Sequence, residues 1–283
     1  MSYRNFTISG FGRVSTLVLC LLLGALSLSL IGCGKIKSAV QSLFRANPVS
    51  KTGSGTHPSR AVNSGPRLAI ILDDVAGDPA AADAIFSLHY PLTLSVFPNH
   101  PLSTQIAQEA HRRGYQVMLH LPMESLANET PESQELRPGM SPAEISSLLS
   151  SMLNTVPYAV GVNNHQGSLA TSDARLMAGL MPALRNHHLF FIDSRTTAAS
   201  VAYDAAQSAG VPCAFRNVAF LDDIQEFAAI RHQLELAAKD AREKGHAIAI
   251  GHPHPGTLRA LGEFLPQAEA QGIHLVHASD LVH

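Results

Sequence analysis

The chain has 283 residues, of which 46% are hydrophobic and 15% are charged, and its formal net charge is −2. This composition allows a sizeable core, and the lack of a basic excess argues against a nucleic-acid-binding protein. The sequence also contains 15 histidines and no tryptophan. Histidine is the commonest side-chain metal ligand and carries protons near neutral pH, so its abundance points to metal and acid–base chemistry.

Residues 1–33 are typical of an export signal rather than of a folded element. Arg4 and Arg13 give a basic start, residues 14–31 are almost wholly apolar, and the segment ends in Leu-Ile-Gly-Cys at Cys33. This ending resembles a bacterial lipobox, in which the signal peptidase cuts before a cysteine that receives a lipid. We therefore expect lipidation at Cys33 and export to the periplasmic side of a bacterial membrane. An uncleaved signal anchor is the alternative, because the apolar run approaches the length of a membrane span.

Residues 34–66 are rich in Ser, Gly, Lys, Asn and Pro without sustained periodicity, which predicts a tether between membrane and domain. From Arg67 to His283, short apolar runs alternate with amphipathic segments. The predicted strands are 68–72, 92–97, 115–119, 158–162, 189–192, 211–215, 246–250 and 273–276. The predicted helices are 80–88, 103–113, 142–154, 173–187, 223–244 and 256–270.

Continuous apolar strands joined by helices predict a parallel sheet that is covered on both faces. Four glycines lie between a helix and the next strand, where a left-handed cap is favoured: Gly114, Gly210, Gly245 and Gly272. Seven or eight such units favour an irregular (β/α) barrel over residues 67–283, in the α/β class, rather than an open doubly wound sheet. No glycine-rich phosphate loop follows the first strand, which argues against nucleotide binding.

Polar side chains follow the predicted strands at five points. They are Asp73 and Asp74, His120 and Glu124, Asn164 and His165, Asp193 and Arg195, and His252 and His254. The carboxyl ends of parallel strands meet at one rim of a barrel, where the active sites of such folds lie. Because five groups share one topological position, we predict a functional site at this rim.

Some of these residues also have structural interpretations. Asp73 and Asp74 could cap the helix that begins near Asp78, but two carboxylates after four apolar residues are costly unless paired or bound to metal. The segment 193–195 could support a loop, with its arginine holding a carboxylate by a two-pronged contact. Asp222 and Asp223 precede the predicted helix 224–244, and we interpret them as its N-cap.

One aspartate and two histidines around a divalent ion form a catalytic metal site if positions remain open for water and substrate. Such an ion lowers the pKa of its water and polarises a carbonyl. A second carboxylate can take the proton of the water, and a histidine from the opposite rim can protonate a leaving amine. Asp73, Asp74, His120 or His165, and His254 supply these parts, and the reaction that they fit is hydrolysis of an amide or ester.

The segments 68–74, 120–124, 161–168, 193–196 and 251–255 together resemble the divergent polysaccharide deacetylase family, a bacterial relative of the carbohydrate esterase deacetylases. The resemblance covers residues 67–283. It implies an incomplete (β/α) barrel and a metal-dependent enzyme, with zinc as the expected ion, that removes acetyl groups from an envelope polysaccharide such as peptidoglycan.

The resemblance also implies roles for single residues. Asp73 would be the base and Asp74 a metal ligand, as in ordinary deacetylases. Their next motif has two ligand histidines four residues apart, whereas this chain has His120 and Glu124 with a proline between them. His165 is therefore the preferred third ligand, with Glu124 as the alternative.

The late histidine of the family, its general acid, would match His254 or His252. The arginine of the third family motif has no clear counterpart, so Asn164 or a backbone amide would contact the oxyanion, and Asp193 and Arg195 would support the site. These departures motivate a second hypothesis, a non-catalytic envelope module that binds glycan or protein. A glycoside hydrolase would need two carboxylates that flank a sugar bond, and it would leave the histidines without a role.

Overall fold

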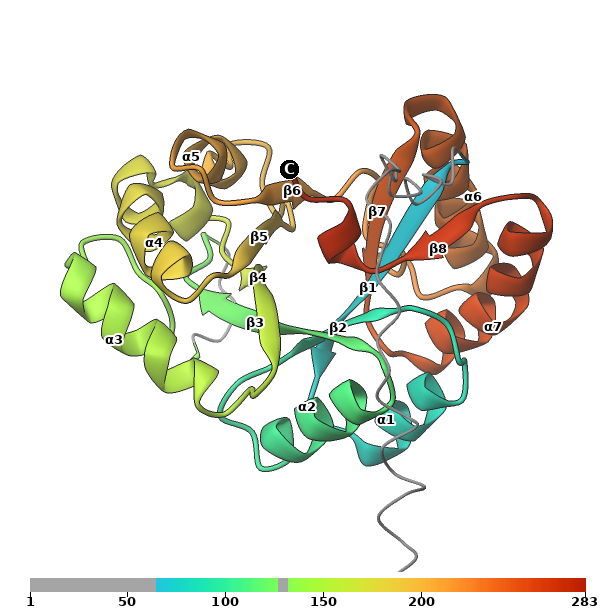
Figure 1. Cartoon of the computed structure of the whole chain (residues 1–283), viewed down its shortest axis with the longest axis horizontal. Coiled ribbons are helices and arrows are strands. Elements are labelled where there is room, and N and C mark those ends of the chain that lie inside the picture. Colours follow the sequence, from blue (N-terminus) through green and yellow to red (C-terminus); the bar gives the residue numbers. More distant parts are fainter. Residues whose placement is uncertain (1–64, 127–131) are drawn as a thin grey trace, which may run out of the picture. The chain divides into compact units, whose positions relative to one another are not determined.

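In the computed structural model, which describes residues 65–126 and 132–283, eight parallel strands alternate with helices (Figure 1). The strands are β1 (Arg67–Val75), β2 (Thr93–Val96), β3 (Gln116–Met123), β4 (Ala159–Gln166), β5 (Phe190–Asp193), β6 (Cys213–Phe215), β7 (His246–Gly251) and β8 (His274–Val276). The helices are α1 (Pro79–Phe86), α2 (Ser103–Arg112), α3 (Pro142–Leu153), α4 (Ala174–Asn186), α5 (Ala202–Ser208), α6 (Phe227–Lys244) and α7 (Pro255–Ala270), with 3₁₀ turns η1 (Ala170–Ser172) and η2 (Ala278–Asp280).

Each of the eight predicted strands overlaps an observed one, and the predicted (β/α) barrel is confirmed. The glycines at 114, 210, 245 and 272 have positive φ, as their position after a helix predicted. Helix α5 was not predicted, because its seven residues are too few to show a clear helical period.

The strands pair in the order β6-β5-β4-β3-β2-β1-β7, and β8 pairs with the first three residues of β1. Strands β6 and β7 are the two ends of this order, so the barrel is incomplete (Figure 1). The loop between β6 and α6 partly closes the gap. The backbone N–H groups of Asn217 and Leu221 donate to the carbonyl oxygens of Ile248 and Ile250 on β7. This loop therefore lies along β7 where a strand is missing.

Alternate residues of each strand belong to two different apolar layers. The outer layer lies between the strands and the helices and includes Leu68, Ile70 and Leu72. The inner cluster is the barrel interior, and its members from the strands are Ala69, Ile71, Met118, Phe190, Ile192, Ala214, Ile248 and Ile250. A Cβ atom on Gly161 would overlap the ring of Phe190, so glycine at this position makes room for the aromatic ring.

Residues 278–283 fill the end of the barrel where the strands begin. Ala278 and Leu281 pack in the inner cluster. The backbone N–H of Ala278 donates to the hydroxyl of Thr93, and His283 exchanges backbone hydrogen bonds with Cys213 on β6. Polar groups inside the barrel can therefore meet solvent at the opposite end, where the strands finish.

The predicted export signal (1–33) with Cys33, and residues 34–64 of the predicted tether, lie outside the described residues. Among the described residues, none of the helices combines the length and the hydropathy that crossing a membrane requires.

Candidate functional site

Two adjacent aspartates end β1 and reach the same rim through different backbone conformations. Asp73 continues the inward-facing series of β1 and is buried, with 1% of its surface exposed. Asp74 has a left-handed backbone with φ at 56°, and the pairing of β1 with β2 shifts register between Leu72 and Val75. A left-handed residue redirects the chain, so the side chain of Asp74 also reaches the interior histidines and stays 41% exposed.

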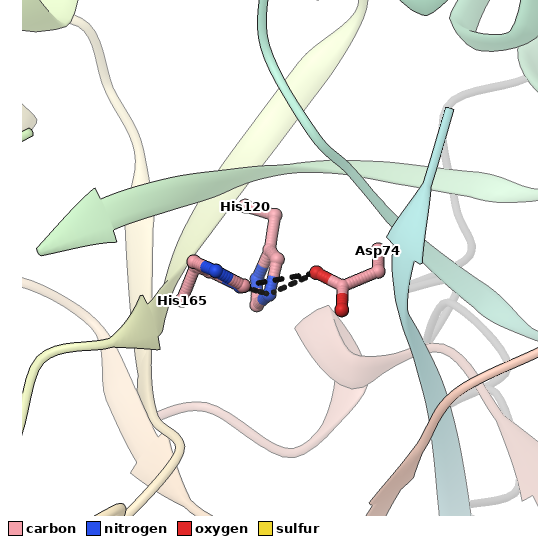
Figure 2. A group of neighbouring side chains, drawn as sticks. All are labelled: Asp74, His120 and His165. Carbon is pink, nitrogen blue, oxygen red and sulfur yellow. Dashed lines mark hydrogen bonds and ion pairs between the residues drawn. The ribbon is translucent and has the colours of Figure 1, made fainter. Parts of the chain in front are cut away.

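Asp74, His120 and His165 converge from β1, β3 and β4, as Figure 2 shows. Oδ1 of Asp74 lies 3.1 Å from Nε2 of His120 and 3.0 Å from Nδ1 of His165. The two imidazole nitrogens are 3.1 Å apart. The side chain of His120 is 2% exposed and that of His165 is 17% exposed. Three atoms that can bind a metal therefore meet at one point, which is accessible from the side of Asp74 and His165.

The buried side chain of Asn163 determines which nitrogen of His120 faces this group. Its Oδ1 accepts hydrogen bonds from Nδ1 of His120, at 2.9 Å, and from the hydroxyl of Ser95. Its Nδ2 donates to Oδ1 of Asp73, at 2.8 Å, and to Oγ of Ser194, at 3.1 Å. An amide oxygen only accepts, so Nδ1 of His120 carries a proton. Nε2 is thereby oriented to bind a cation.

The side chains of this group shift one another's ionisation. Burial opposes the charged form of Asp74, but hydrogen bonds from His120 and His165 hold the pKa of Asp74 well below its usual range. Burial alone would lower the pKa of His120, but the carboxylates of Asp73 and Asp74 outweigh burial and raise that pKa to about 9. The rim therefore stabilises a positive charge next to Asp74, which a proton or a metal ion can supply.

The donor set fits a divalent metal ion. Two imidazole nitrogens and one carboxylate oxygen are a known ligand set of catalytic zinc, which keeps a fourth position for water or substrate. Ligands about 2.1 Å from a tetrahedral zinc ion are about 3.4 Å from one another. The separations here, 3.0 to 3.1 Å, are close to that value. These three residues can therefore hold a divalent ion after small movements.

A histidine–aspartate pair lies on the other side of Asp74, just after β7. Nδ1 of His252 is 2.9 Å from Oδ1 of Asp222, and the backbone N–H of His252 donates to Oδ2 at 2.7 Å. The hydroxyl of Thr257 in α7 also donates to Oδ2, at 2.8 Å. Nε2 of His252 lies 3.8 Å from Oδ2 of Asp74. Asp222 thus fixes the ring of His252 with Nε2 directed at the metal-binding group.

This pair favours a protonated histidine. Burial would lower the pKa of His252, but its hydrogen bond to Asp222 and the negative charges of Asp73, Asp222 and Asp74 raise it. Burial would likewise raise the pKa of Asp222, but the hydrogen bonds from His252 and Thr257 lower it. A histidine whose pKa is raised keeps its proton to higher pH, which suits a general acid.

Asp73 lies deeper in the rim and has the opposite tendency. Its Oδ1 accepts from Asn163, and Nδ1 of His120 lies 3.8 Å from the same oxygen. Burial raises the pKa of Asp73, and the charges of His120 and His252 offset this rise only in part. A carboxylate with a raised pKa binds a proton more strongly, as a general base must.

The model of the divergent polysaccharide deacetylases matches residues 70–282 of this chain. The chain belongs to the divergent polysaccharide deacetylase family. It is also 41% identical over 217 residues to the uncharacterized protein YibQ of Escherichia coli K12. This alignment covers 77% of this chain and 67% of the relative. The family that the five strand-end motifs predicted is thus confirmed.

The fold of this family member is also found in solved structures. An uncharacterized protein from Agrobacterium tumefaciens C58 aligns with a TM-score of 0.73 and 22% identity, over 82% of this chain and 92% of that one. The catalytic domain of a peptidoglycan N-acetylglucosamine deacetylase from Eubacterium rectale aligns with a TM-score of 0.52 and 15% identity, over 81% of this chain and 94% of that one. At these identities the likeness establishes the fold alone.

Asn164, which the sequence suggested as an oxyanion contact, has other bonds in this family member. Its Oδ1 accepts from the backbone N–H of Ser194, at 2.9 Å. Its Nδ2 donates to the backbone oxygen of Gln166, at 2.8 Å. These bonds hold the ends of β4 and β5 together. The structure therefore supports a structural role for Asn164.

Asp193 and Arg195 also serve the loop after β5. Oδ1 of Asp193 accepts from the backbone N–H of Arg195, and Oδ2 accepts from the hydroxyl of Ser200. The guanidinium of Arg195 lies 3.4 Å from the ring centroid of Phe215. In the part of the chain that the structure describes, Arg195 stacks on this aromatic ring and forms no ion pair with a carboxylate, so the suggested two-pronged contact is not seen there.

The two open choices of the sequence analysis can be compared with the geometry. Glu124 is not part of the group that Asp74, His120 and His165 form, which favours His165 as the third ligand. His254 is the N-cap residue of α7, and its ring centroid is 5.8 Å from that of His252. Of these two histidines, His252 is the one whose Nε2 lies 3.8 Å from Oδ2 of Asp74. The geometry therefore favours His252 as the acid.

The N-cap interpretation of Asp222 is wrong. Helix α6 begins at Phe227 and its N-cap is Glu226, four residues beyond Asp222. The Asp222 side chain is buried because the loop that carries it pairs with β7 through Leu221. The sequence did hold a signal, since Asp222 follows apolar Phe220 and Leu221 much as Asp73 follows the apolar residues of β1.

Two further residues at the rim were missed. Asn163 was given no role from the sequence, yet it contacts both Asp73 and His120. Arg216, just after β6, donates to the backbone oxygens of Ser194 and Val218. Its pKa is lowered by burial, while Asp73 is among the carboxylates that oppose this. Arg216 therefore brings a positive charge toward the base from a strand where no arginine was expected.

Proposed function

We propose that this chain is a metal-dependent hydrolase of the polysaccharide deacetylase type, which uses zinc and removes acetyl groups from a cell-envelope glycan. The observation that carries the proposal is the meeting of Asp74, His120 and His165 within 3.1 Å, with His252 on the other side of Asp74. Family membership and the barrel fold support the same reaction class.

The residues divide the reaction among them. A divalent ion held by Asp74, His120 and His165 would polarise the acyl carbonyl and lower the pKa of the attacking water. Asp73 accepts the proton of that water as its oxygen bonds to the carbonyl carbon. His252 donates a proton to the leaving nitrogen as the carbon–nitrogen bond breaks, so acetate and a free amine result. Asp222 favours the protonated form of His252 and holds its ring in the required orientation.

The substrate and the location belong to the same proposal. The Eubacterium rectale neighbour acts on peptidoglycan, and an acetylated envelope glycan is the corresponding substrate here. A lipid on Cys33 would tether the domain to the periplasmic side of a bacterial membrane. Mass spectrometry of the mature chain should find a lipid-modified N-terminal cysteine, and Cys33→Ser should remove the modification and release the protein from membranes.

Metal analysis and acetate release together test the proposed activity. The full-length protein should bind about one zinc ion per chain and release acetate from N-acetylated peptidoglycan. Asp74→Ala should lose both properties. Asp83→Ala, an exposed aspartate on α1, is the matched control and should keep both. Normal acetate release by Asp74→Ala would refute the mechanism.

The burial of Asp73 favours a second candidate function. A base must reach the attacking water, and the side chain of Asp73 is only 2% exposed. The alternative is a non-catalytic envelope module that binds glycan or protein at the same rim. It predicts that the wild type binds glycan without forming product, and that Asp73→Asn binds as tightly as the wild type. Loss of acetate release in Asp73→Asn would exclude this alternative.

A further inference from the structure

A cavity of about 270 Å³ opens beside the proposed catalytic residues, between the loops that follow β1 and β7. Asp74 and His252 are among the residues that line it. The apolar part of its lining comes from the end of β1 and the following turn, from α1 and from the opposite loop: Val75, Ala76, Gly77, Ala81, Ala82, Pro253 and Pro255. Asp78 and His254 line it as well. Most of the lining residues therefore carry only small hydrocarbon groups, and the polar side chains are those of Asp74, Asp78, His252 and His254.

The walls offer few hydrogen-bond donors. The backbone N–H of Ala76 donates to the oxygen of Asp74, that of Ala82 to Asp78, and that of His254 to His252. Pro253 and Pro255 have no N–H to offer. The carboxylate of Asp78 accepts from the backbone N–H of Ala80, and the imidazole of His254 is the other polar side chain in the lining beside Asp74 and His252. Against the alanines and prolines, a hydrocarbon chain would not lose hydrogen bonds on entry.

The position of the cavity selects which part of a substrate enters it. Oδ2 of Asp74 and Nε2 of His252 are 3.8 Å apart, and the scissile carbonyl must lie near both. Only the acyl group and the leaving group extend from that carbonyl. Because most of the lining residues are apolar, the acyl group is the part that fits.

The size of the cavity exceeds that of an acetyl group. A water-sized group occupies about 30 Å³, so 270 Å³ has room for about nine such groups. Acetyl places one methyl group beyond its carbonyl. We propose that this cavity is an acyl-chain pocket, and that the substrates include amides or esters of acyl groups with about four to six carbons. This inference rests on the proposed hydrolase activity and widens its substrate class.

Two parallel measurements test the pocket with the full-length, zinc-loaded protein. The first compares kcat/KM for glucosamine that is N-acylated with two, four or six carbons. The second measures the binding of acetate, butyrate and hexanoate, which needs no turnover. Both series should rise by about fourfold per added methylene, the equivalent of about 0.8 kcal/mol, until the pocket is full.

Ala81→Leu is designed to fill the pocket from α1, where the side chain of residue 81 is half-buried. It should abolish the rise with chain length in both series. Ala80→Leu adds the same side chain at an exposed position of α1 outside the pocket and should behave like the wild type. Gly77→Leu is a second filling variant, because a Cβ atom there would meet no heavy atom within 4 Å.

The outcomes separate this inference from the proposed function. Turnover of acetyl substrates with no gain for longer chains would overturn the acyl-chain pocket and leave the hydrolase intact. No turnover of any substrate, with carboxylate affinity that still rises with length and falls in Ala81→Leu, would overturn the hydrolase and leave the pocket intact. A flat carboxylate series overturns the pocket in either case.

Discussion

Two groups of one aspartate and two histidines lie at the same rim, and they differ in what their aspartate already binds. Asp74 meets the free nitrogens of His120 and His165 and is 41% exposed. In the second group, of Asp222, His252 and His254, both oxygens of the buried Asp222 accept hydrogen bonds from protein donors. The same residue types therefore suit a cation in one group and the holding of a proton in the other.

The surroundings of the second group strengthen this contrast. His254 is the N-cap residue of α7, a helix of 16 residues. The positive end of a helix dipole disfavours a metal cation close by. We therefore expect the chain to bind its metal at Asp74, His120 and His165, and to use His252 for proton transfer.

Among variants that test the separate roles of the two groups, His252→Gln should have the largest effect on the rate of hydrolysis. This variant removes the proposed acid but no metal ligand, so hydrolysis should fall by about 10² to 10⁴-fold while zinc content stays unchanged. Zinc analysis and acetate release on the same samples check this. His254→Gln is the control and should stay near the wild-type rate. Zinc loss in His252→Gln would show that the two groups do not have separate roles.

The pH dependence of zinc binding should come next in size. His120 has a pKa raised to about 9 by Asp73 and Asp74 against the effect of burial, so below that pH zinc must displace a proton from it. Zinc affinity should therefore fall as pH falls, by about tenfold per unit and about 100-fold from pH 8 to pH 6. Competition with a chelator of known affinity measures this. An affinity that is constant over this range would place zinc at other ligands.

Asn163 contacts both a proposed metal ligand, His120, and the proposed base, Asp73. Variants of Asn163 can therefore affect metal binding and proton transfer separately. Asn163→Leu removes the acceptor that orients His120, so zinc affinity should fall by about 10- to 100-fold. Asn163→Asp keeps that acceptor but sets a carboxylate against Asp73, so it should retain zinc and lose hydrolysis. Calorimetric zinc titration and acetate release distinguish the two variants. Equal zinc affinity in both would contradict the orienting role.

The smallest effect is expected from Asp222→Asn. Asp222 helps to raise the pKa of His252, so its replacement lowers that pKa. An acid must be protonated to work, and the alkaline limb of the kcat/KM profile should therefore move to lower pH, with a loss of about tenfold at neutral pH. The acidic limb, which reflects Asp73, should not move. An unshifted alkaline limb would remove Asp222 from the mechanism.

The strands could be predicted because a sheet covered on both faces needs apolar residues at nearly every position. The same property conceals which alternate residues face the interior. Asn163 and Asn164 are neighbours with equal side chains, yet one points to the metal-binding group and the other holds a loop. Only the packed barrel, in which Met118 and Ile192 define the inner face, decides between them.

Asp222 could not be placed from sequence for a different reason. Its position depends on a loop that pairs with β7, through Leu221 and Ile250, in the gap where the barrel lacks a strand. Such a contact between distant segments leaves no periodic pattern. Helix propensity and capping rules act within a few residues, and they assigned Asp222 to the helix that follows it.

The backbone conformation of Asp74 lowers the stability of the fold, while its side chain supplies a proposed metal ligand. Its φ of 56° is one that glycine adopts freely and that strains an aspartate by about 1 kcal/mol. Asp74→Gly would relieve that strain and delete the ligand in one step. A lineage that no longer needed the cation would gain stability from this change. A single substitution, Asp74→Gly, would therefore both stabilise the barrel and remove the metal ligand. This chain retains the aspartate at that position.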